Sequence, residues 1–168
     1  MNIKGIAAVV AVVVVGLVAY NYWSTKQPKA EIKLRIVNVL DKKYFDDAYI
    51  KGSNNVESIN VPFTELEATV KNWDKTVPVV TYCANYQCTA SGAAAKKLRE
   101  LGFTDVWAYE GGTAEWYQLG KTDKEYAIEG PAKEGYLEMP SKKSTEAEEG
   151  VQEITAAELQ KKIKAATL

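Results

Sequence analysis

Two cysteines, Cys83 and Cys88, stand close enough in the sequence to take part in one reaction. Residues 77–82, just before Cys83, form a β-branched apolar run that is typical of a buried strand. Residues 89–101 are rich in Ala, Leu, Lys and Glu and are followed by Gly102, which predicts a helix. Cys83 is therefore expected on a loop beside a helix N-terminus, where free N–H groups and the helix dipole favour a thiolate. This position indicates sulfur chemistry.

The composition limits the other functions open to the chain. Its 168 residues, 46% of them hydrophobic, can bury one core of ordinary size. The net charge is −1 and charges of both signs are interleaved, so the sequence has no basic footprint for nucleic acid. With no histidine and only two cysteines, a zinc site would be short of its usual ligands, and histidine acid–base catalysis is excluded. No metal and no cofactor is expected.

The N-terminal residues have the pattern of a membrane anchor. Residues 5–25 carry no charge, and residues 6–19 are almost wholly Val, Ala, Leu and Ile. A span of about 20 apolar residues crosses a bilayer as a helix, and aromatic residues gather at its far end, as at a headgroup layer. A cleaved signal peptide is the alternative, but the small-residue cleavage pattern is missing. The sequence predicts a single-pass anchor over residues 1–25 and a polar tether over residues 26–30.

Two conflicting signals bear on the orientation of this anchor. A short N-terminal tail bearing Lys4 fits export of the domain, whereas Lys26, Lys29, Lys33 and Arg35 after the span favour the cytoplasm. Export is the expectation adopted, which places the soluble domain outside the cytoplasm, in the periplasm.

Beyond the tether, apolar runs alternate with helical patterns, which is typical of a parallel α/β sheet flanked by helices. Functional sites in such folds lie at the carboxyl ends of strands, where Cys83 is expected. Asp41 is expected to cap the first helix, and Thr64 with Glu67 to form a capping box on the second. The expected strands are residues 33–40, 59–62, 77–82 and 105–109, and the expected helices are residues 42–47, 64–73, 89–101 and the surroundings of 114–117.

The C-terminal part of the chain is more polar. Residues 132–151 are expected to form a polar linker, because their composition offers little to pack. Thr155 and Glu158 again have capping-box spacing and open a predicted helix within residues 152–168. The apolar face of that helix would consist of Leu159, Ile163 and Ala166.

Several segments, in order along the chain from about Glu31 to Gly120, resemble the rhodanese-like domain family. The matching segments are Val37-Asn38-Val39, Tyr49-Ile50-Lys51-Gly52-Ser53, Ile59-Asn60-Val61-Pro62, Tyr82-Cys83, residues 98–103, and Glu110-Gly111-Gly112 with Trp116. The resemblance implies a rhodanese-like parallel sheet flanked by helices over residues 31–131, preceded by the N-terminal transmembrane helix.

By this resemblance, Cys83 accepts a sulfane sulfur and carries it as a persulfide to a thiophilic acceptor. Backbone N–H groups of the loop would stabilise the charge on the sulfur. Thr89 and Ser91 either add hydroxyl donors or cap the helix. The residues expected to form the substrate-binding loop are Ala84, Asn85, Tyr86, Gln87 and Thr89, together with Cys88.

Two loop positions depart from the family pattern. Tyr86 stands at the usual glycine position and Cys88 at the usual arginine position. Without that arginine the loop has no fixed cation for a thiosulfate-like dianion, so efficient thiosulfate:cyanide transfer is not expected. Phosphatase or arsenate-reductase chemistry on this fold is expected even less, because the first arginine after Cys83 is Arg99.

Cys88 places a second thiol beside the first. It could attack a persulfide on Cys83, releasing sulfide and leaving a Cys83–Cys88 disulfide, or an oxidant could form that disulfide directly. The sequence predicts a membrane-tethered protein that transfers sulfur or carries a persulfide. Its partner would be a small sulfur donor or a thiol acceptor, such as a protein thiol. A thiol–disulfide redox switch and a catalytically inactive binding module are the alternatives.

The C-terminal helix also resembles an element of the family. Rhodanese-like domains usually begin with a short Ser/Thr-x-x-Glu-Leu helix, and in this chain the first strand follows the tether almost directly. Residues 154–163 look like that missing element, so the helix is predicted to dock on the domain in its place. A free helix, or one that pairs with a partner, is the alternative.

Overall fold

The computed structural model describes residues 31–138 and 150–168. The predicted anchor (residues 1–25), the tether (26–30) and most of the predicted polar linker (139–149) lie outside the described residues. Within the described ranges, no helix has both the length and the apolar character needed to cross a bilayer.

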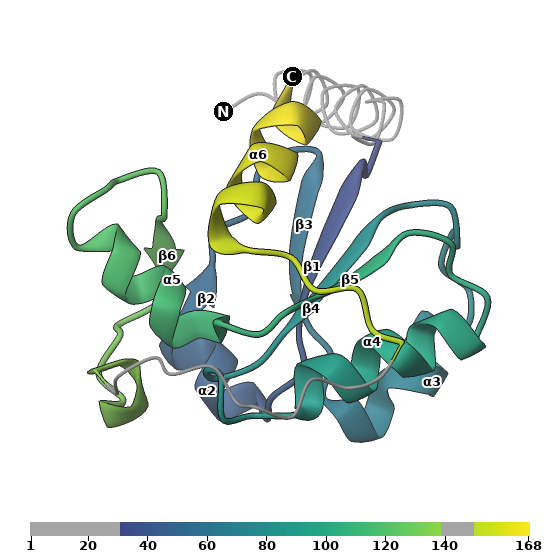
Figure 1. The fold of residues 1–168 in the computed structure, drawn as a ribbon, viewed down its shortest axis with the longest axis horizontal. Coiled ribbons are helices and arrows are strands. Elements are labelled where there is room, and N and C mark those ends of the chain that lie inside the picture. The colour runs from purple at the N-terminus through teal and green to yellow at the C-terminus, as the bar shows by residue number, and fades with distance from the viewer. Residues whose placement is uncertain (1–30, 139–149) are drawn as a thin grey trace, which may run out of the picture. The chain divides into compact units, whose positions relative to one another are not determined.

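A four-stranded parallel sheet forms the centre of the domain, with its strands in the order β3-β1-β4-β5 (Figure 1). The strands are β1 (Leu34–Asn38), β3 (Val56–Asn60), β4 (Val79–Tyr82) and β5 (Val106–Tyr109). Every residue of β4 is buried, since this internal strand is covered on both faces, which accounts for its nearly continuous apolar sequence. The parallel α/β fold expected from the sequence is confirmed.

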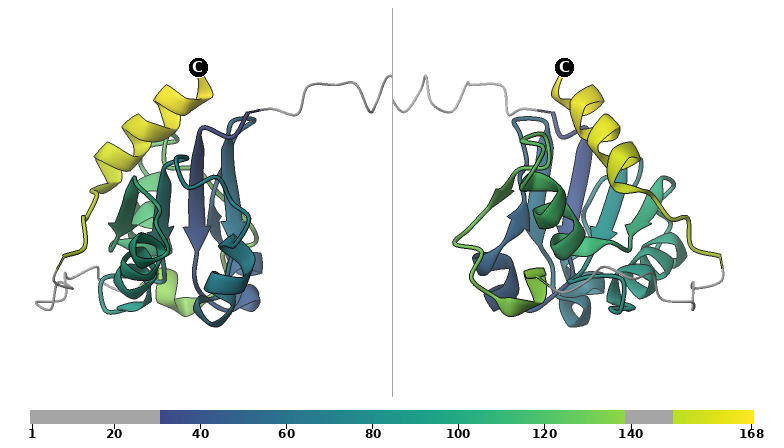
Figure 2. Two further views of the ribbon diagram at one scale, coloured as in Figure 1. Left: turned by 90° about the vertical axis from the view of Figure 1, so that its right-hand side faces the viewer. Right: turned by 60° about the vertical axis from the view of Figure 1, so that its left-hand side comes forward.

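Helices cover both faces of the sheet (Figure 2). Val79 and Val80 of β4 belong to different apolar cores, because successive side chains of a strand point to opposite faces. The core that includes Val79 also contains residues of α3 (Leu66–Val70) and α4 (Ala90–Glu100). The core that includes Val80 contains residues of α5 (Gly112–Gly120) and α6 (Ala156–Thr167).

Two predicted helix caps are wrong. Helix α2 (Lys42–Asp47) lies where the sequence predicts it, but the Asp41 side chain makes no capping hydrogen bond. The expected capping box of Thr64 and Glu67 does not form, because η1 (Phe63–Glu65) is a 3-10 turn closed by a backbone hydrogen bond of 2.8 Å. Helix α3 begins only after this turn, so it is shorter than the predicted helix.

The structure contains two short elements that the sequence pattern did not predict. Strands β2 (Tyr49–Ile50) and β6 (Ile128–Glu129) pair in an antiparallel ribbon. Each has only two residues, too few to display a period in the sequence.

Residues expected at the start of the polar linker form the 3-10 turn η2 (Gly135–Glu138), and Leu137 is buried there.

The predicted docking of the C-terminal helix on the domain is confirmed. Leu159 is fully buried, Ala166 is buried, and Ile163 packs against the same core. Thr155 and Glu158 form the predicted capping box: the Glu158 N–H donates to Thr155 Oγ1, and the Thr155 N–H donates to the Glu158 carboxylate. The apolar face read from the sequence is therefore the face that docks.

The segment before α6 extends the edge of the sheet beside β5. The Ala108 N–H donates to the Gln152 carbonyl at 2.8 Å, and the Ile154 N–H donates to the Ala108 carbonyl at 3.0 Å. Arg99 of α4 also holds this segment, because its guanidinium donates to the Gly150 carbonyl and to the Gln152 side chain. The C-terminal segment thus supplies both a sheet contact and a covering helix.

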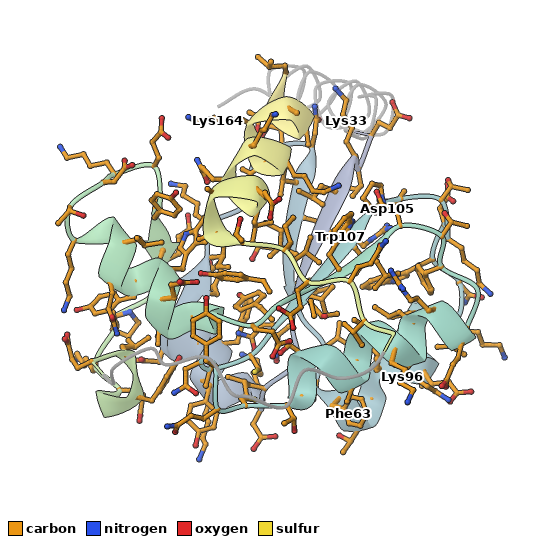
Figure 3. The ribbon with its side chains drawn as sticks, viewed as in Figure 1. Lys33, Phe63, Lys96, Asp105, Trp107 and Lys164 are labelled. Carbon is orange, nitrogen blue, oxygen red and sulfur yellow. The ribbon has the colours of Figure 1, made fainter. Side chains whose placement is uncertain are left out.

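Polar contacts also join α6 to Trp107 of β5 and to Asp105 just before that strand, both labelled in Figure 3. Lys162 lies over the Trp107 ring, 5.0 Å from its centroid, and 3.7 Å from the Asp105 carboxylate. Trp107 Nε1 donates to that same carboxylate. Such exposed ion pairs each contribute little, so the apolar burial dominates the docking.

Candidate active site

Cys83 is the first residue after β4, and the loop of residues 83–89 leads into α4, as predicted. Asn85 shapes this loop. Its Oδ1 accepts a hydrogen bond from the Gln87 N–H at 3.0 Å, and its carbonyl accepts one from the Cys88 N–H at 3.0 Å. These tight turns fold the chain back and bring Cys88 to Cys83.

The N-terminus of α5 holds the start of the loop. The Thr113 N–H donates to the Cys83 carbonyl at 3.0 Å, and the Ala114 N–H donates to the Ala84 carbonyl at 2.9 Å. These bonds satisfy N–H groups that a helix leaves free in its first turn. Gly112, at φ +61°, makes the approach possible, because a Cβ there would lie 2.5 Å from the Cys83 oxygen. The Gly-Gly motif therefore has a packing role beside the loop.

The Cys83 sulfur lies in surroundings that favour a neutral thiol. Its side chain is fully buried, and its Sγ donates to the Cys88 carbonyl at 3.2 Å. Burial raises the pKa of Cys83, and the contact with the Cys88 sulfur raises it further. The expectation of a stabilised Cys83 thiolate is not met in this conformation, because burial outweighs the hydrogen bonds of Ser91, which lower the pKa of Cys83.

Cys88 is the thiol that the loop prepares as an anion. The contact with Cys83 lowers the pKa of Cys88, against the opposing effect of burial. Backbone N–H groups of Ala90 and Ala84 also bond to this sulfur and lower its pKa. Amide groups of the loop thus act on Cys88 as well as on Cys83, and the pair consists of a buried thiol and a partly exposed one.

This assignment predicts a pH profile. Alkylation of Cys88 by iodoacetamide should rise with pH through a midpoint below that of an ordinary cysteine, because the thiolate is the reacting form and the pKa of Cys88 is lowered. Replacing Cys83 with alanine removes the largest cause of the low pKa, so the midpoint should move up toward about 8.5. Timed alkylation followed by peptide mass spectrometry measures both midpoints. An unchanged midpoint in Cys83→Ala would show that Cys83 has no part in the shift.

Ser91 connects Cys83 to a carboxylate on the next strand. Its Oγ lies 3.4 Å from the Cys83 Sγ and donates to the Glu110 Oε1 at 3.0 Å. Ser91 is fully buried in the first turn of α4. Of the two predicted roles for this residue, hydrogen bonding at the site is the one that the structure supports.

A second carboxylate, Glu115 of α5, holds the loop from another side. The Tyr86 hydroxyl donates to its Oε1 at 3.0 Å, and the Tyr109 hydroxyl donates to its Oε2 at 2.8 Å. Burial and the Glu115 charge raise the pKa of Tyr86 to about 12. Sequence reasoning missed both Glu115 and the partnership of Glu110 with Ser91, although Glu110 flanks the Gly-Gly motif.

The other predicted loop residues differ in exposure. Asn85 is buried and Ala84 is partly buried, whereas Gln87 and Thr89 are exposed. Thr89 precedes α4 but makes no side-chain capping bond. Within residues 31–138 and 150–168, no group of three or more metal-ligating side chains gathers.

The loop offers no cation to an incoming anion. Residues 83–89 contain neither lysine nor arginine. Arg99 has other partners, since its guanidinium donates to the Val106 and Gly150 carbonyls and to the Gln152 side chain. The loop therefore has no cation of its own to pair with an anion.

Comparisons with known proteins agree with this arrangement. The family model for the rhodanese-like domain matches residues 24–119. The chain is 29% identical over 84 residues to the uncharacterized protein YqhL of Bacillus subtilis, covering 50% of this chain and 61% of that protein. It is 31% identical over 85 residues to the thiosulfate sulfurtransferase GlpE of Shewanella oneidensis, covering 51% of this chain and 77% of that protein.

Solved structures are also similar to this chain. The BH2092 protein from Bacillus halodurans is 23% identical, with a TM-score of 0.49, covering 68% of this chain and 85% of that protein. The family model alone spans more than half of the chain, including Cys83 and the Gly-Gly motif. The chain therefore belongs to the rhodanese-like domain family, within the rhodanese-like sulfurtransferases.

Proposed function

We propose that this protein transfers sulfane sulfur through a persulfide on Cys83, with Cys88 as the resolving thiol. One observation carries the proposal: the Cys83 thiol donates to the Cys88 carbonyl at 3.2 Å, which holds the two cysteines together at the carboxyl end of β4. Sulfur exchange requires a thiolate and a target sulfur to meet, and this contact supports such a meeting. Membership of the rhodanese-like family supports the same role for Cys83.

The chemistry needs no metal and no oxidant in its first half. The Cys83 thiolate attacks the outer sulfur of a donor R–S–SH, a new S–S bond forms, and the S–S bond of the donor breaks so that RS⁻ leaves. An acceptor thiolate can then attack the outer sulfur of the Cys83 persulfide and regenerate the Cys83 thiol. Alternatively, the Cys88 thiolate attacks Cys83 Sγ, expels HS⁻ and leaves a disulfide, which an external dithiol must reduce.

The surroundings of the loop favour a persulfide over a dianionic donor. Glu110 accepts a hydrogen bond from Ser91, beside the loop, and Glu115 accepts one from Tyr86 of the loop. Two carboxylates, and a loop of residues 83–89 without lysine or arginine, disfavour a thiosulfate-like dianion. The proposed partners are therefore a small persulfide or polysulfide donor and a thiol acceptor, such as a protein thiol.

The location of this chemistry is part of the proposal. Residues 1–25 are proposed to anchor the chain in a membrane, with the domain on the periplasmic side. A membrane-impermeant maleimide applied to intact cells should then label Cys88, whose side chain is partly exposed. Labelling that appears only after the cells are opened would place the domain in the cytoplasm.

Intact mass after incubation with a sulfane donor tests the proposed transfer. The Cys88→Ser variant should gain the mass of one sulfur atom, because it can load Cys83 but cannot resolve the persulfide. Cys83→Ser should gain none at that position. A chain that gains no sulfur in any form, although Cys83 still reacts with iodoacetamide, would overturn the proposal.

A thiol–disulfide switch is the second candidate function. The low pKa of Cys88 and its contact with Cys83 favour it, since both promote direct oxidation of the pair. Mild oxidation should then remove two hydrogens from the wild-type mass, and either Cys→Ser substitution should abolish that loss. Failure of both sulfur loading and oxidation would leave a binding module.

A further inference from the structure

A continuous chain of contacts leads from Cys83 to a carboxylate. Cys83 Sγ lies 3.4 Å from Ser91 Oγ, and Ser91 Oγ donates to Glu110 Oε1 at 3.0 Å. Cys83 and Ser91 are fully buried, and Glu110 is partly exposed. The chain thus runs from the buried sulfur toward solvent.

Strand register explains why these residues meet. Tyr82 of β4 pairs with Tyr109 of β5, so Cys83 and Glu110 leave neighbouring parallel strands at the same level. Ser91, in the first turn of α4, fills the space between them. Both strands and the helix have buried, packed residues, which fixes this geometry.

The hydrogen bonds give the chain a direction. A hydroxyl has a single hydrogen, and that of Ser91 goes to the Glu110 carboxylate, which can only accept. The Ser91 oxygen therefore faces Cys83 as an acceptor, and in the relay the Cys83 thiol turns its single hydrogen from the Cys88 carbonyl to that oxygen. A proton that leaves Cys83 along this path ends on Glu110.

We propose that Glu110 is the terminal proton acceptor for the Cys83 thiol, reached through the Ser91 hydroxyl. This role rests on the proposed function, in which Cys83 must become a thiolate to attack the donor. The chain has no histidine to serve as a base. A carboxylate in a relay with a hydroxyl supplies that function.

The transfer balances without a further reactant. The Cys83 proton passes to Ser91 Oγ as the Ser91 proton passes to Glu110, which gives a thiolate, a hydroxyl and a carboxylic acid. The thiolate then attacks the outer sulfur of R–S–SH, and RS⁻ leaves. Because Glu110 is partly exposed, its proton can pass to RS⁻, which restores the carboxylate and releases RSH.

Cys88 is a competing acceptor for the same proton, since it already accepts a hydrogen bond from Cys83. A Cys88 that takes this proton is no longer a thiolate, so it cannot then resolve the persulfide. A relay to Glu110 leaves Cys88 charged for that second step. The titratable groups around the loop that bear on a pH profile are Cys88, Tyr86, Tyr109, Glu110, Glu115 and Glu153.

The decisive experiment uses the full chain in a Cys88→Ser background, so that Cys83 is the sole thiol. Alkylation of Cys83 by iodoacetamide should depend weakly on pH near neutrality, because a carboxylate, unlike a histidine, is an ordinary base whose own titration lies well below pH 7. Adding Glu110→Gln should slow this reaction at pH 7 at least tenfold and restore a dependence of about tenfold per pH unit. The glutamine can still accept the Ser91 hydrogen bond, so packing is preserved and only the base is lost.

Further variants separate a relay from a structural effect. Ser91→Ala should slow the reaction as much as Glu110→Gln, and the double variant should be no slower than either, because both interrupt one path. Glu110→Asp should recover part of the rate. Glu100→Gln, which replaces an exposed carboxylate on the same helix as Ser91, is the matched control and should behave as the parent.

The alkylation rates of these variants test the relay independently of sulfur transfer. An unchanged rate in Glu110→Gln, or effects of Glu110→Gln and Ser91→Ala that multiply, would overturn it. Sulfur loading is measured separately with a persulfide donor. A relay that passes the alkylation test in a chain that never loads sulfur would leave the relay standing and reject the proposed transfer.

Discussion

Replacing Gly112 with alanine is expected to lower the free energy of unfolding by about 2–5 kcal/mol and to displace the active-site loop. The Gly112 backbone has φ +61°, a conformation that costs an alanine roughly 1–2 kcal/mol. The added Cβ would also lie 2.5 Å from the Cys83 oxygen and 2.6 Å from the Ala84 carbonyl carbon. These are backbone atoms, so the strain cannot be relieved by a side-chain rotation.

The displacement should be visible at the cysteines as well as in stability. A loop pushed away from α5 loses the bonds from the Thr113 and Ala114 N–H groups, so Cys83 should become more accessible to iodoacetamide. Urea unfolding and timed alkylation measure the two effects. Gly135→Ala is the matched control, because a Cβ at Gly135 meets nothing within 4 Å. A Gly112→Ala protein with parental stability and parental Cys83 reactivity would contradict the packing role of this glycine.

Truncation before residue 151 is expected to prevent stable folding of the domain. It would remove α6 and the segment that pairs with Ala108, and it would uncover the core that contains Trp116. Leu159 is fully buried, and replacing this one residue with alanine should lower the free energy of unfolding by about 2–5 kcal/mol. Since a domain has a net stability of only about 5–15 kcal/mol, loss of the whole segment should exceed what the remainder can tolerate.

The Leu159→Ala variant tests the docking of α6 by a stability measurement that does not require the truncated chain to fold. Leu159→Ala should lower the urea midpoint without changing the slope of the transition. Lys161→Ala, an exposed position on the same helix, is the control and should unfold like the parent. A Leu159→Ala protein as stable as the parent would mean that α6 docking contributes nothing to the fold.

The fold was predictable because local patterns and the tertiary structure agree in most places. The apolar run of β4, the alanine-rich α4 and the capping box of α6 are all local signals, and the structure contains each element. The capping box expected at Thr64 failed because a 3-10 turn after Pro62 takes its place. A pattern of residue types does not distinguish between these two turns.

The site was predictable in position but less so in electrostatics. Strand and helix patterns place Cys83 on the loop, and spacing places Cys88 near it. Which sulfur receives the amide N–H groups depends on how the loop folds around Asn85, and that geometry reverses the expected pKa shifts. The partnership of Ser91 with Glu110 follows from the register of β4 and β5, which no local pattern encodes.

The position of α6 has a consequence for biosynthesis. Residues 150–168 complete a sheet edge and a core whose other members lie far earlier in the chain. During translation, the earlier strands must therefore wait, with an apolar face uncovered, until this segment has left the ribosome exit tunnel. Nascent chains arrested before that point are expected to bind chaperones, and release of the last helix is expected to end that binding.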